Sequence, residues 1–589
     1  MDQRRLFLAI AISLAILLGF QAIYRQLVPQ PPAQQVARVA SPAPGTPPKP
    51  SDTVGATPSD AGTAPTAPPR ETPRLRIEAP RVSGSFDLVG ARLDDLVLRD
   101  YHETIAPDSP LVRLLAPMSG PQPYDVQFGW SAAGASDVRL PGNDTQWTAS
   151  ADTLGGTQPV TLSWDNGAGL TFQIVLAVDD NYMFTVQQRV VNKTGAPVSL
   201  YPWSRIRRDY TPEVAGYYIL HEGLIGVLDG TLRETKYATA RSEGEKHDGV
   251  ALQITSDGGW AGITDKYWLA ALVPDQAIPS TATFRSIQEK PGQDPKTATG
   301  YQVDFVTRDA QAAAPGATSA LTTHLFAGAK VVHLLDDYEN EYHIPNFDKA
   351  VDFGWFYFLT KPFFFAIDWL YHRLGNFGLA IMAFTVFVKL VFFPLANKSY
   401  KSMSKMKLLG PKMTAIRERF KDDPARMQQE MMTIYKTEGV NPASGCLPMV
   451  IQIPVFFSLY KVIFVTIEMR HAPFFGWIRD LSAVDPTNVF NLFGLLPFDP
   501  TAISPMLHLG AWPLIMGGTM FLQQRMNPPP PDPVQARLFQ FMPLIFTFML
   551  ARFPAGLVIY WSWNNLLSVA QQWLIMRNTR LARPKMART

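Results

Sequence analysis

Residues 376–396 read Asn-Phe-Gly-Leu-Ala-Ile-Met-Ala-Phe-Thr-Val-Phe-Val-Lys-Leu-Val-Phe-Phe-Pro-Leu-Ala, an apolar run long enough to cross a bilayer. The one charge inside this run is Lys389. An ionisable residue at membrane depth costs about 2.5–3.5 kcal/mol on insertion scales, and such residues mark functional sites. Lys389 lies about seven residues from the end of the run, roughly 10 Å deep in a helix. The alternative is a snorkelling lysine whose ammonium group reaches the interface.

The composition of the chain is an average over a soluble part and an apolar part. The chain has 589 residues, of which 47% are hydrophobic, and a net charge of +3. This length exceeds one ordinary domain, and the small net charge argues against a protein that recognises nucleic acid. The single cysteine, Cys446, excludes an intrachain disulfide and is interpreted as a small buried hydrophobe.

The N-terminal part predicts a membrane anchor, a linker and a β-rich domain. In residues 1–25, Arg4 and Arg5 precede an apolar run without a small-residue cleavage site, which favours a retained transmembrane anchor over a signal peptide. Residues 26–78 are dominated by Pro, Ala, Thr and Ser, which is typical of an extended linker. Residues 79–335 show short strand-forming runs with frequent turn signals, which predict a large β-sandwich.

Two neighbouring runs illustrate the strand pattern of that domain. Residues 171–178 and 182–191 are rich in strand-forming residues and are separated by Asp179-Asp180-Asn181. This pattern predicts two strands joined by a turn. The sequence contains neither a metal-ligand cluster nor a G-x-S-x-G nucleophile elbow, so we expect no bound metal, no cofactor and no enzymatic activity.

The C-terminal part contains five apolar segments that are long enough to cross a membrane as helices. These segments are residues 376–396, 444–467, 507–524, 537–553 and 555–577. Residues 350–375 precede them and place Lys361, Asp368 and His372 on one helical face. We therefore expect residues 350–375 to form an amphipathic helix on the membrane surface.

The distribution of positive charge predicts the orientation of these segments. Loop 397–443 has ten Lys and Arg residues and five acidic residues, whereas loop 468–506 has two and four. The tail, 578–589, is basic. The positive-inside rule therefore places loop 397–443 and the tail in the cytoplasm. Together with the anchor, this gives six spans with both termini inside and the β-rich domain outside the cytoplasm.

Polar residues on the other segments are candidates to surround Lys389. On the last segment, polar residues recur at helical spacing and form a stripe. Because no acidic residue in the segments is placed to pair with Lys389, we expect a wet groove that receives polar parts of another molecule. The predicted groove residues are Lys389, Thr385, Gln452, Ser458, Tyr560, Asn564, Asn565 and Ser568. The alternative is that the uncharged members hydrogen-bond between packed helices.

Residues 397–443 predict a helical hairpin with its turn at Asp422-Asp423-Pro424. Methionines recur on one face of each arm, and flexible methionine side chains suit promiscuous binding surfaces. The methionine and isoleucine positions of the two faces are Met403, Met406, Met413, Ile416, Met427, Met431 and Ile434. The alternative is a hairpin that packs on itself or on lipid headgroups.

Local motifs across residues 350–577 resemble the YidC family of membrane protein insertases. They are Phe-Pro-Leu at 393–395, Ser402-Met-x-Lys-Met-Lys, Gly410-Pro-Lys, Tyr435-Lys-x-Glu-x-Val-Asn-Pro, Gly445-Cys-Leu-Pro, Gln452-x-Pro-Val-Phe, Phe541-Met-Pro and Phe553-Pro-Ala-Gly-Leu. The anchor, linker and β-rich domain are similar to the Gram-negative form of that family.

This resemblance implies a bacterial inner-membrane insertase with a five-helix core, an anchor helix and a periplasmic β-supersandwich. It implies insertion of small proteins without the Sec translocon, cooperation with Sec and its accessory subunits, and substrate contact along the third and last spans. A cytoplasmic hairpin would recruit nascent membrane proteins or ribosomes. We expect its contact residues to be Lys405, Met406, Lys412, Met427 and Met431.

The groove cation departs from the pattern of the resembled family, in which this position is usually arginine. Lys389 keeps the charge but lacks the planar guanidinium fork, so we expect retained function with less stringent hydrogen bonding. Two other functions stay open on the residues alone. One is a solute transporter or channel with a midplane polar site. The other is an anchored carbohydrate-active enzyme that uses acidic residues of the β-rich domain.

Overall fold

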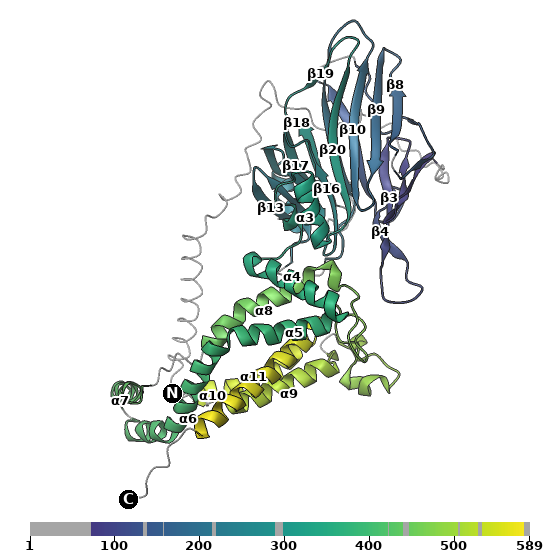
Figure 1. Ribbon diagram of the computed structural model, residues 1–589. Helices are drawn as coiled ribbons and strands as arrows, with labels where there is room; N and C mark the ends of the chain where they lie inside the picture. The colour runs from purple at the N-terminus through teal and green to yellow at the C-terminus, as the bar shows by residue number, and fades with distance from the viewer. Residues whose placement is uncertain are drawn as a thin grey trace, which may run out of the picture. The chain divides into compact units, whose positions relative to one another are not determined.

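The computed structural model describes residues 72–581, apart from 133–137, 157, 215–219, 289–298, 422, 440–446, 505–506 and 528–532. The chain divides into two compact units (Figure 1). The first unit contains Leu111–Ala329, Leu334–Ala350 and the chain up to Tyr101, and the second contains His102–Pro110, Lys330–His333 and the chain from Val351. The expected anchor, most of the linker and Cys446 lie outside the described residues.

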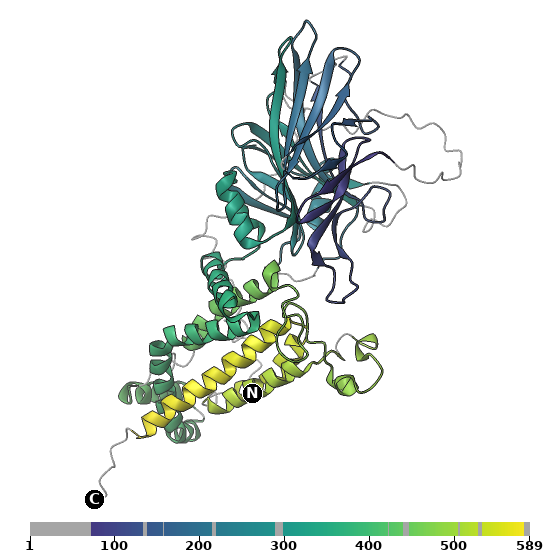
Figure 2. The ribbon, with the colours of Figure 1, turned by 45° about the vertical axis from the view of Figure 1, so that its right-hand side comes forward.

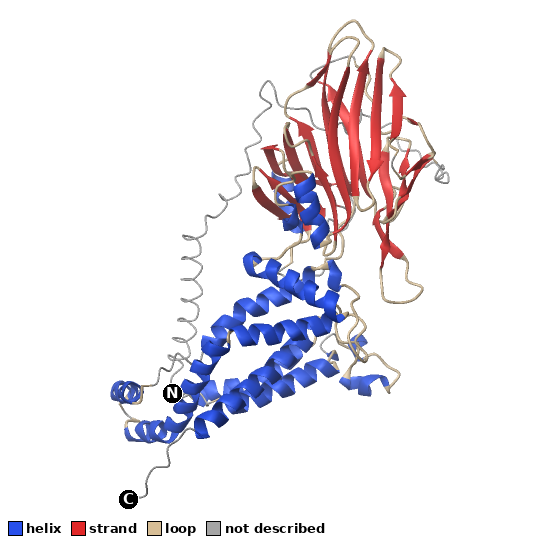
Figure 3. Cartoon of the chain, in the orientation of Figure 1, coloured by secondary structure: helices blue, strands red, loops and turns tan. Residues whose placement is uncertain are grey.

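The first unit consists mainly of two β-sheets, drawn in red in Figure 3. The larger sheet has the order β14 (Val250–Asp257), β17 (Pro279–Gln288), β18 (Thr299–Thr307), β11 (Val198–Arg208), β5 (Tyr124–Ala132), β3 (Arg92–His102), β2 (Val82–Asp87), β1 (Arg74–Glu78) and β7 (Thr153–Leu154), with β19 (Gln311–Ala313) beside β11 and β4 (Leu111–Leu115) beside β3. The other sheet has the order β13 (Thr231–Lys236), β12 (Gly223–Leu228), β15 (Trp260–Thr264), β16 (Trp268–Val273), β20 (Thr318–Ala329), β10 (Met183–Asn192), β9 (Leu170–Val178), β8 (Val160–Asp165) and β6 (Thr148–Ala149). Helices α2 (Tyr237–Lys246) and η1 (Phe347–Ala350) belong to the same unit, and α3 (Val332–Glu341) begins in the second unit and ends in the first.

The predicted pair of strands is confirmed in β9 and β10. These strands run antiparallel, with Phe184 opposite Val178. Side chains along β9 alternate between buried and partly exposed, the pattern of a strand with one face on the core. At the turn, Asp179 Oδ1 accepts hydrogen bonds from the backbone N–H groups of Asn181 and Met183 at 2.9 Å. The aspartate side chain therefore fixes the chain reversal.

The two sheets face each other across a shared core. Trp130 of β5 packs edge-on against Phe172 of β9, with ring centroids 5.1 Å apart. Gln188 Nε2 of β10 donates a hydrogen bond to the carbonyl of Gly129 in β5 at 2.7 Å. Each contact joins one sheet to the other, so the large sandwich expected from the strand pattern is present as two sheets packed face to face.

The second unit is helical, in blue in Figure 3. Its elements are α4 (Tyr357–Leu374), α5 (Phe377–Val391), α6 (Phe393–Arg419), α7 (Pro424–Thr437), α8 (Leu447–Val465), η3 (Ile467–Met469), η4 (Val489–Gly494), η5 (Pro500–Ala502), α9 (Ala511–Met526), α10 (Pro533–Leu550) and α11 (Ala555–Leu581). Helix α11, in yellow in Figure 1, packs against α5, α6, α8 and α9. Polar residues on α11 are therefore brought to several neighbouring helices.

The five apolar segments of the sequence overlap α5, α8, α9, α10 and α11. Within the described chain, no single helix combines the length and the hydropathy that a membrane span requires. Helices α5 and α6 reach both together, although the chain bends by 68° between them. Large apolar side chains are nevertheless exposed on the outer faces, among them Phe387 and Leu390 of α5 and Phe541 and Leu544 of α10. Such a surface is unusual for a water-facing helix bundle.

Several boundaries differ from those expected from the sequence, three of them with a clear physical reason or extent. The first strand begins at Arg74 rather than after residue 78, because the alternating Leu75 and Ile77 side chains are buried. Helix α4 begins at Tyr357 rather than at 350, and the preceding Gly354 has a left-handed φ of 72° that no helix accommodates. Helix α11 continues to Leu581, past the expected end at 577.

Candidate functional site

Lys389 contacts the last helix through one hydroxyl group. Its Nζ donates a hydrogen bond to Ser568 Oγ of α11 at 2.8 Å. Ser568 Oγ donates to the carbonyl of Asn564, one turn earlier, at 2.8 Å. The side chain of Tyr400 in α6 also hydrogen-bonds with Ser568. Three helices thus meet at Ser568, and within the described chain Lys389 has no carboxylate partner.

A second polar contact joins α8 to α11. Gln452 Nε2 donates a hydrogen bond to Tyr560 Oη at 2.8 Å. Tyr560 is buried, whereas Gln452 is only partly buried. Ser458, also on α8, is fully buried, and its Oγ has no hydrogen-bond partner among the described residues. The same holds for Asn564 Oδ1. Ser458 Oγ and Asn564 Oδ1 are therefore buried polar atoms between the helices whose hydrogen-bonding capacity is not satisfied by the described residues.

The remaining two predicted groove residues have other partners. Asn565 Nδ2 donates to Thr519 Oγ1 of α9 at 3.2 Å. Thr385 Oγ1 donates to the carbonyl of Ile381 in its own helix at 2.7 Å. Hydrogen bonds thus link Lys389 to Ser568 and Ser568 to the carbonyl of Asn564. A separate hydrogen bond links Gln452 to Tyr560. Asn565 serves the contact with α9, which is the helix-joining role considered as the alternative.

The sequence reasoning missed a second lysine within the helices. Lys461 Nζ of α8 lies 2.8 Å from Asp352 Oδ1, in the segment before α4. Their side chains are only 11% and 18% exposed. A side chain at Gly354 would place its Cβ 2.8 Å from Lys461 Cε, so glycine leaves room for the lysine. The signal was available, because Lys461, like Lys389, is a charge inside an apolar segment.

A cluster of titratable groups lies where α4 and the residues after α8 meet. Glu468 Oε1 accepts a hydrogen bond from the backbone N–H of Val332 at 2.9 Å. Burial raises the pKa of the Glu468 carboxyl from 4.5 to about 7, against a smaller lowering by this N–H. Asp368 Oδ2 of α4 lies 3.1 Å from His333 Nε2 and 3.4 Å from His372 Nδ1. Asp368 is therefore buried and paired rather than exposed on a polar face.

The predicted hairpin consists of α6 and α7. Leu409 and Met413 form its buried core, and partly buried side chains pack against them, namely Met406, Met431, Ile434 and Tyr435. Lys412 Nζ pairs with Glu438 Oε1 at 2.8 Å across the hairpin. Met406 and Met431 thus pack inside the hairpin, which is the alternative stated for the methionine faces.

The outer surface of the hairpin carries other apolar side chains. Leu408 is 56% exposed and Met432 is 44% exposed. Lys405 is exposed beside Leu408, and Met427 is partly buried. The helical spacing places Leu408 next to Lys405 and Lys412, three and four positions away, whereas Met432 points away from Met431.

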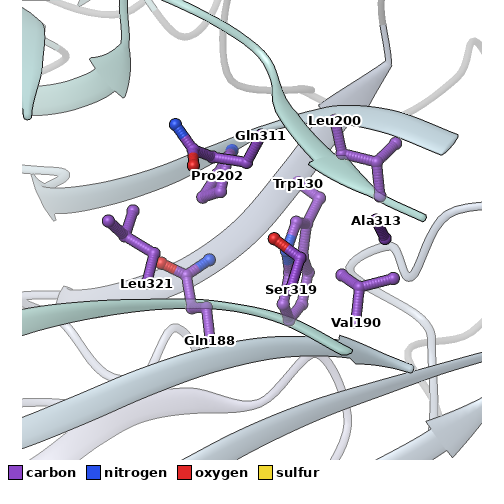
Figure 4. A pocket seen from close by; sticks show the side chains of 9 residues that line it. All are labelled: Trp130, Gln188, Val190, Leu200, Pro202, Gln311, Ala313, Ser319 and Leu321. Carbon is purple, nitrogen blue, oxygen red and sulfur yellow. The ribbon is translucent and has the colours of Figure 1, made fainter. Parts of the chain in front are cut away.

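The β-rich unit contains a small pocket between its sheets (Figure 4). Its lining residues are Trp130, Gln188, Val190, Leu200, Pro202, Gln311, Ala313, Ser319 and Leu321. Gln188, at its edge, already donates to the carbonyl of Gly129. None of these nine described residues is titratable, so the pocket supplies no acid or base for the carbohydrate-active alternative.

Two family models match adjoining parts of the chain. The model described as YidC periplasmic domain matches residues 74–366. The model described as 60Kd inner membrane protein matches residues 369–582. The boundary between the two matches falls within α4.

Proteins of similar sequence cover the chain almost completely. A membrane protein insertase YidC of Granulibacter bethesdensis is 66% identical over 588 residues, covering 100% of both chains. Another of Acidiphilium cryptum is 58% identical over 516 residues, covering 87% of this chain and 85% of that protein. A crystal structure of an active YidC insertase is 19% identical and covers 85% of this chain and 92% of that one. Its TM-score of 0.34 is too low to establish a shared fold.

Proposed function

The chain belongs to the YidC family, and from this premise we propose that it inserts proteins into the bacterial inner membrane. Insertion of an apolar segment is driven by its burial in lipid, at about 25 cal/mol per Å² of apolar surface. The polar flank of that segment is the part that opposes transfer. The protein's task is therefore to offer that flank a polar environment within the membrane.

The observation that carries this proposal is the position of Lys389. Its ammonium group is bonded to a neutral hydroxyl of Ser568 and has no carboxylate partner among the described residues. Apolar side chains cover the outside of α5 and α10, whereas Ser458, Asn564 and Ser568 are buried between helices. A polar interior that contains Lys389, a cation without a carboxylate partner among the described residues, suits a groove that receives acidic or polar segments.

The finer organisation follows from the charge distribution and is part of the proposal. Helices α5, α8, α9, α10 and α11 are the five core spans, and residues 1–25 form the anchor. Both ends lie in the cytoplasm, and the β-rich unit is a periplasmic β-supersandwich. The excess of basic residues in 397–443 over 468–506 supports this orientation.

The proposed partners are nascent membrane proteins, membrane lipids, the Sec translocon with its accessory subunits, and the ribosome. The hairpin of α6 and α7 is the recruiting element. Its exposed Lys405, Leu408 and Met432 support a contact with apolar, flexible chains.

The test compares Lys389→Ala, Lys389→Met and Lys389→Arg in inner-membrane vesicles. Insertion of a single-span protein with an acidic N-terminal tail is followed by protease protection. We expect Ala and Met to slow insertion by roughly tenfold, the factor that corresponds to 1.4 kcal/mol, and Arg to preserve it. A second substrate with its tail acids changed to amides is the matched control.

The outcomes separate the role of Lys389 from the function itself. A loss confined to the acidic substrate supports a groove cation that handles charge. Normal insertion by Lys389→Ala would overturn this role and leave Lys389 as a snorkelling residue. Equal insertion with and without the wild-type protein would overturn the proposed function.

A further inference from the structure

The loop between α8 and α9 contains an apolar stretch with an unusual lack of charge. Residues 486–498 read Pro-Thr-Asn-Val-Phe-Asn-Leu-Phe-Gly-Leu-Leu-Pro-Phe. The nearest charged residues are Asp485 before this stretch and Asp499 after it. We call residues 489–503 the apolar loop; it contains η4 and η5.

The apolar loop exposes most of its large side chains. Every residue from Leu492 to Asp499 is exposed. Leu495 is 82% exposed and Ile503 is 76% exposed. In Figures 1 and 2 this light-green segment extends away from the helices of its unit. A contiguous exposed apolar surface of this kind marks an interaction site.

The backbone of the apolar loop turns these side chains outward. Leu492 and Phe493 have φ values of 53° and 60°, a left-handed conformation that bulky residues rarely adopt. Internal hydrogen bonds hold it: Phe493 N–H donates to the carbonyl of Asn488 at 2.8 Å, and Gly494 N–H donates to Asn491 Oδ1 at 2.9 Å. Leu496 N–H donates to the carbonyl of Asn491 at 3.1 Å. These three backbone donors are thus satisfied within the loop, as a lipid environment requires.

The base of the apolar loop is tied to the start of α9. Asp485 is buried, and its carboxylate accepts hydrogen bonds from the backbone N–H of Trp512 at 2.8 Å and from Trp477 Nε1 at 3.1 Å. Asn488 Nδ2 donates to the carbonyl of Leu507 at 2.7 Å. The loop therefore projects from a rigid base beside α9, whose own Leu514 and Ile515 are exposed. Exposed apolar side chains therefore occur both on the loop and on the helix that follows it.

We propose that the apolar loop inserts into the boundary between headgroups and acyl chains of the bilayer leaflet next to the start of α9. The proposal rests on the chain lying in a membrane, as its proposed function requires. A protein partner would fit less well, because protein interfaces have a polar rim. Here Asp485 is buried, residues 486–498 carry no charged side chain, and the exposed Asp499 lies at the end of that stretch, where both of its carboxylate oxygens bond to Thr501 Oγ1 at 2.7 Å.

The test places a fluorescent label at Leu495→Cys in the full chain carrying Cys446→Ser. The protein is reconstituted in vesicles of phosphatidylethanolamine and phosphatidylglycerol. One quencher is a nitroxide on the lipid near the headgroup, and the other is iodide on both sides of the membrane. Ala314→Cys, in an exposed turn of the β-rich unit, is the matched control.

We expect lipid nitroxide to quench the label at 495 strongly and iodide to quench it weakly, with the reverse at 314. Equal access of iodide to both positions would overturn the proposal. Shielding from iodide without quenching by lipid would overturn it as well, since a protein or a second copy would then cover the loop.

A paired substitution separates lipid contact from loop folding. Leu492→Asn removes an apolar side chain but suits the left-handed backbone, whereas Leu492→Met keeps the apolar character. With the label at 495, we expect Asn to lower lipid quenching and Met to preserve it, at unchanged melting temperature in detergent. Protease-protected insertion is measured in the same vesicles. If the protein inserts its substrate normally while the label at 495 is exposed to water, the loop proposal alone is overturned. If the label at 495 is embedded in lipid but the substrate is not inserted, only the proposed function is overturned.

Discussion

Lys461 in α8 and Asp352 in the segment before α4 form an ion pair at 2.8 Å, with both side chains largely shielded from solvent. The pair joins helix α8 to the segment that precedes α4. Removing one partner of a buried pair costs about 3–5 kcal/mol, because the other charge stays buried. The partial exposure of both side chains reduces that cost.

We therefore expect Lys461→Met and Asp352→Asn each to destabilise the protein by about 2 kcal/mol. The double variant should be more stable than the sum of the single effects predicts, since neither charge is then left alone. Thermal unfolding of the full chain in detergent measures all four proteins. Strictly additive effects would show that the two residues are not coupled.

The contact between Gln452 and Tyr560 predicts a smaller effect. Tyr560→Phe removes the acceptor of the 2.8 Å hydrogen bond but keeps the buried ring. We expect a loss of about 1 kcal/mol of stability, the usual contribution of one hydrogen bond. Insertion should slow less than in Lys389→Ala. A double-mutant cycle with Gln452→Ala is the control, and a coupling energy of zero would contradict the contact.

Glu468 predicts a pH dependence of stability. Because burial raises its folded-state pKa from 4.5 to about 7, the folded protein binds more protons than the unfolded chain between these values. Its contribution to stability is therefore fully present below pH 4.5 and is lost as the pH rises through 7. The largest possible loss is on the order of 3 kcal/mol.

Glu468→Gln imitates the protonated acid, so we expect it to remove this loss at neutral pH. The melting temperature of the variant should exceed that of the wild type at pH 8 and match it at pH 5. His333 and Asp368 lie near the same group, so His333→Gln is the matched control variant. An unchanged slope of melting temperature against pH in Glu468→Gln would contradict the assignment.

The hairpin predicts two different effects for its apolar residues. Met413 is buried in the hairpin core, so Met413→Ser should destabilise the hairpin by about 2–3 kcal/mol. Leu408→Ser and Met432→Ser remove exposed side chains and should leave its stability unchanged. If the hairpin recruits nascent chains, these two variants reduce crosslinking of a ribosome-bound nascent chain to Lys405→Cys. Full crosslinking in the double variant would exclude this surface.

The patterns that predicted the elements are local ones. Apolar runs indicated the helices of the second unit, whereas the alternation of Leu75 and Ile77 in the first strand was missed, because residues 26–78 were assigned to the linker. Contacts between distant segments have no such signature. The pairing of Lys461 with Asp352 depends on how α8 lies beside the chain before α4, which periodicity along either segment does not encode.

The hairpin shows the same limit in its side chains. Methionine spacing predicted an apolar face on each arm, and the packing of α6 on α7 brings only some of those residues, among them Met413 and Met431, into the hairpin core. Likewise, helical spacing placed Asn564 and Asn565 on one predicted polar stripe. In the orientation that α11 takes against α9, Asn565 hydrogen-bonds to Thr519, whereas the carbonyl of Asn564 accepts a hydrogen bond from Ser568.

The hydroxyl oxygen of Ser568 is a shared hydrogen-bond partner of residues on α5, α6 and α11. Lys389, Tyr400 and the carbonyl of Asn564 all bond to its hydroxyl. If Lys389 engages a substrate, as we propose, Ser568 loses one of these three partners and keeps Tyr400 and the carbonyl of Asn564. Tyr400 belongs to the same continuous helix as the first arm of the hairpin. Under the proposed function, the binding of a substrate at Lys389 and the position of the helix that forms the first arm of the hairpin therefore depend on the same serine hydroxyl.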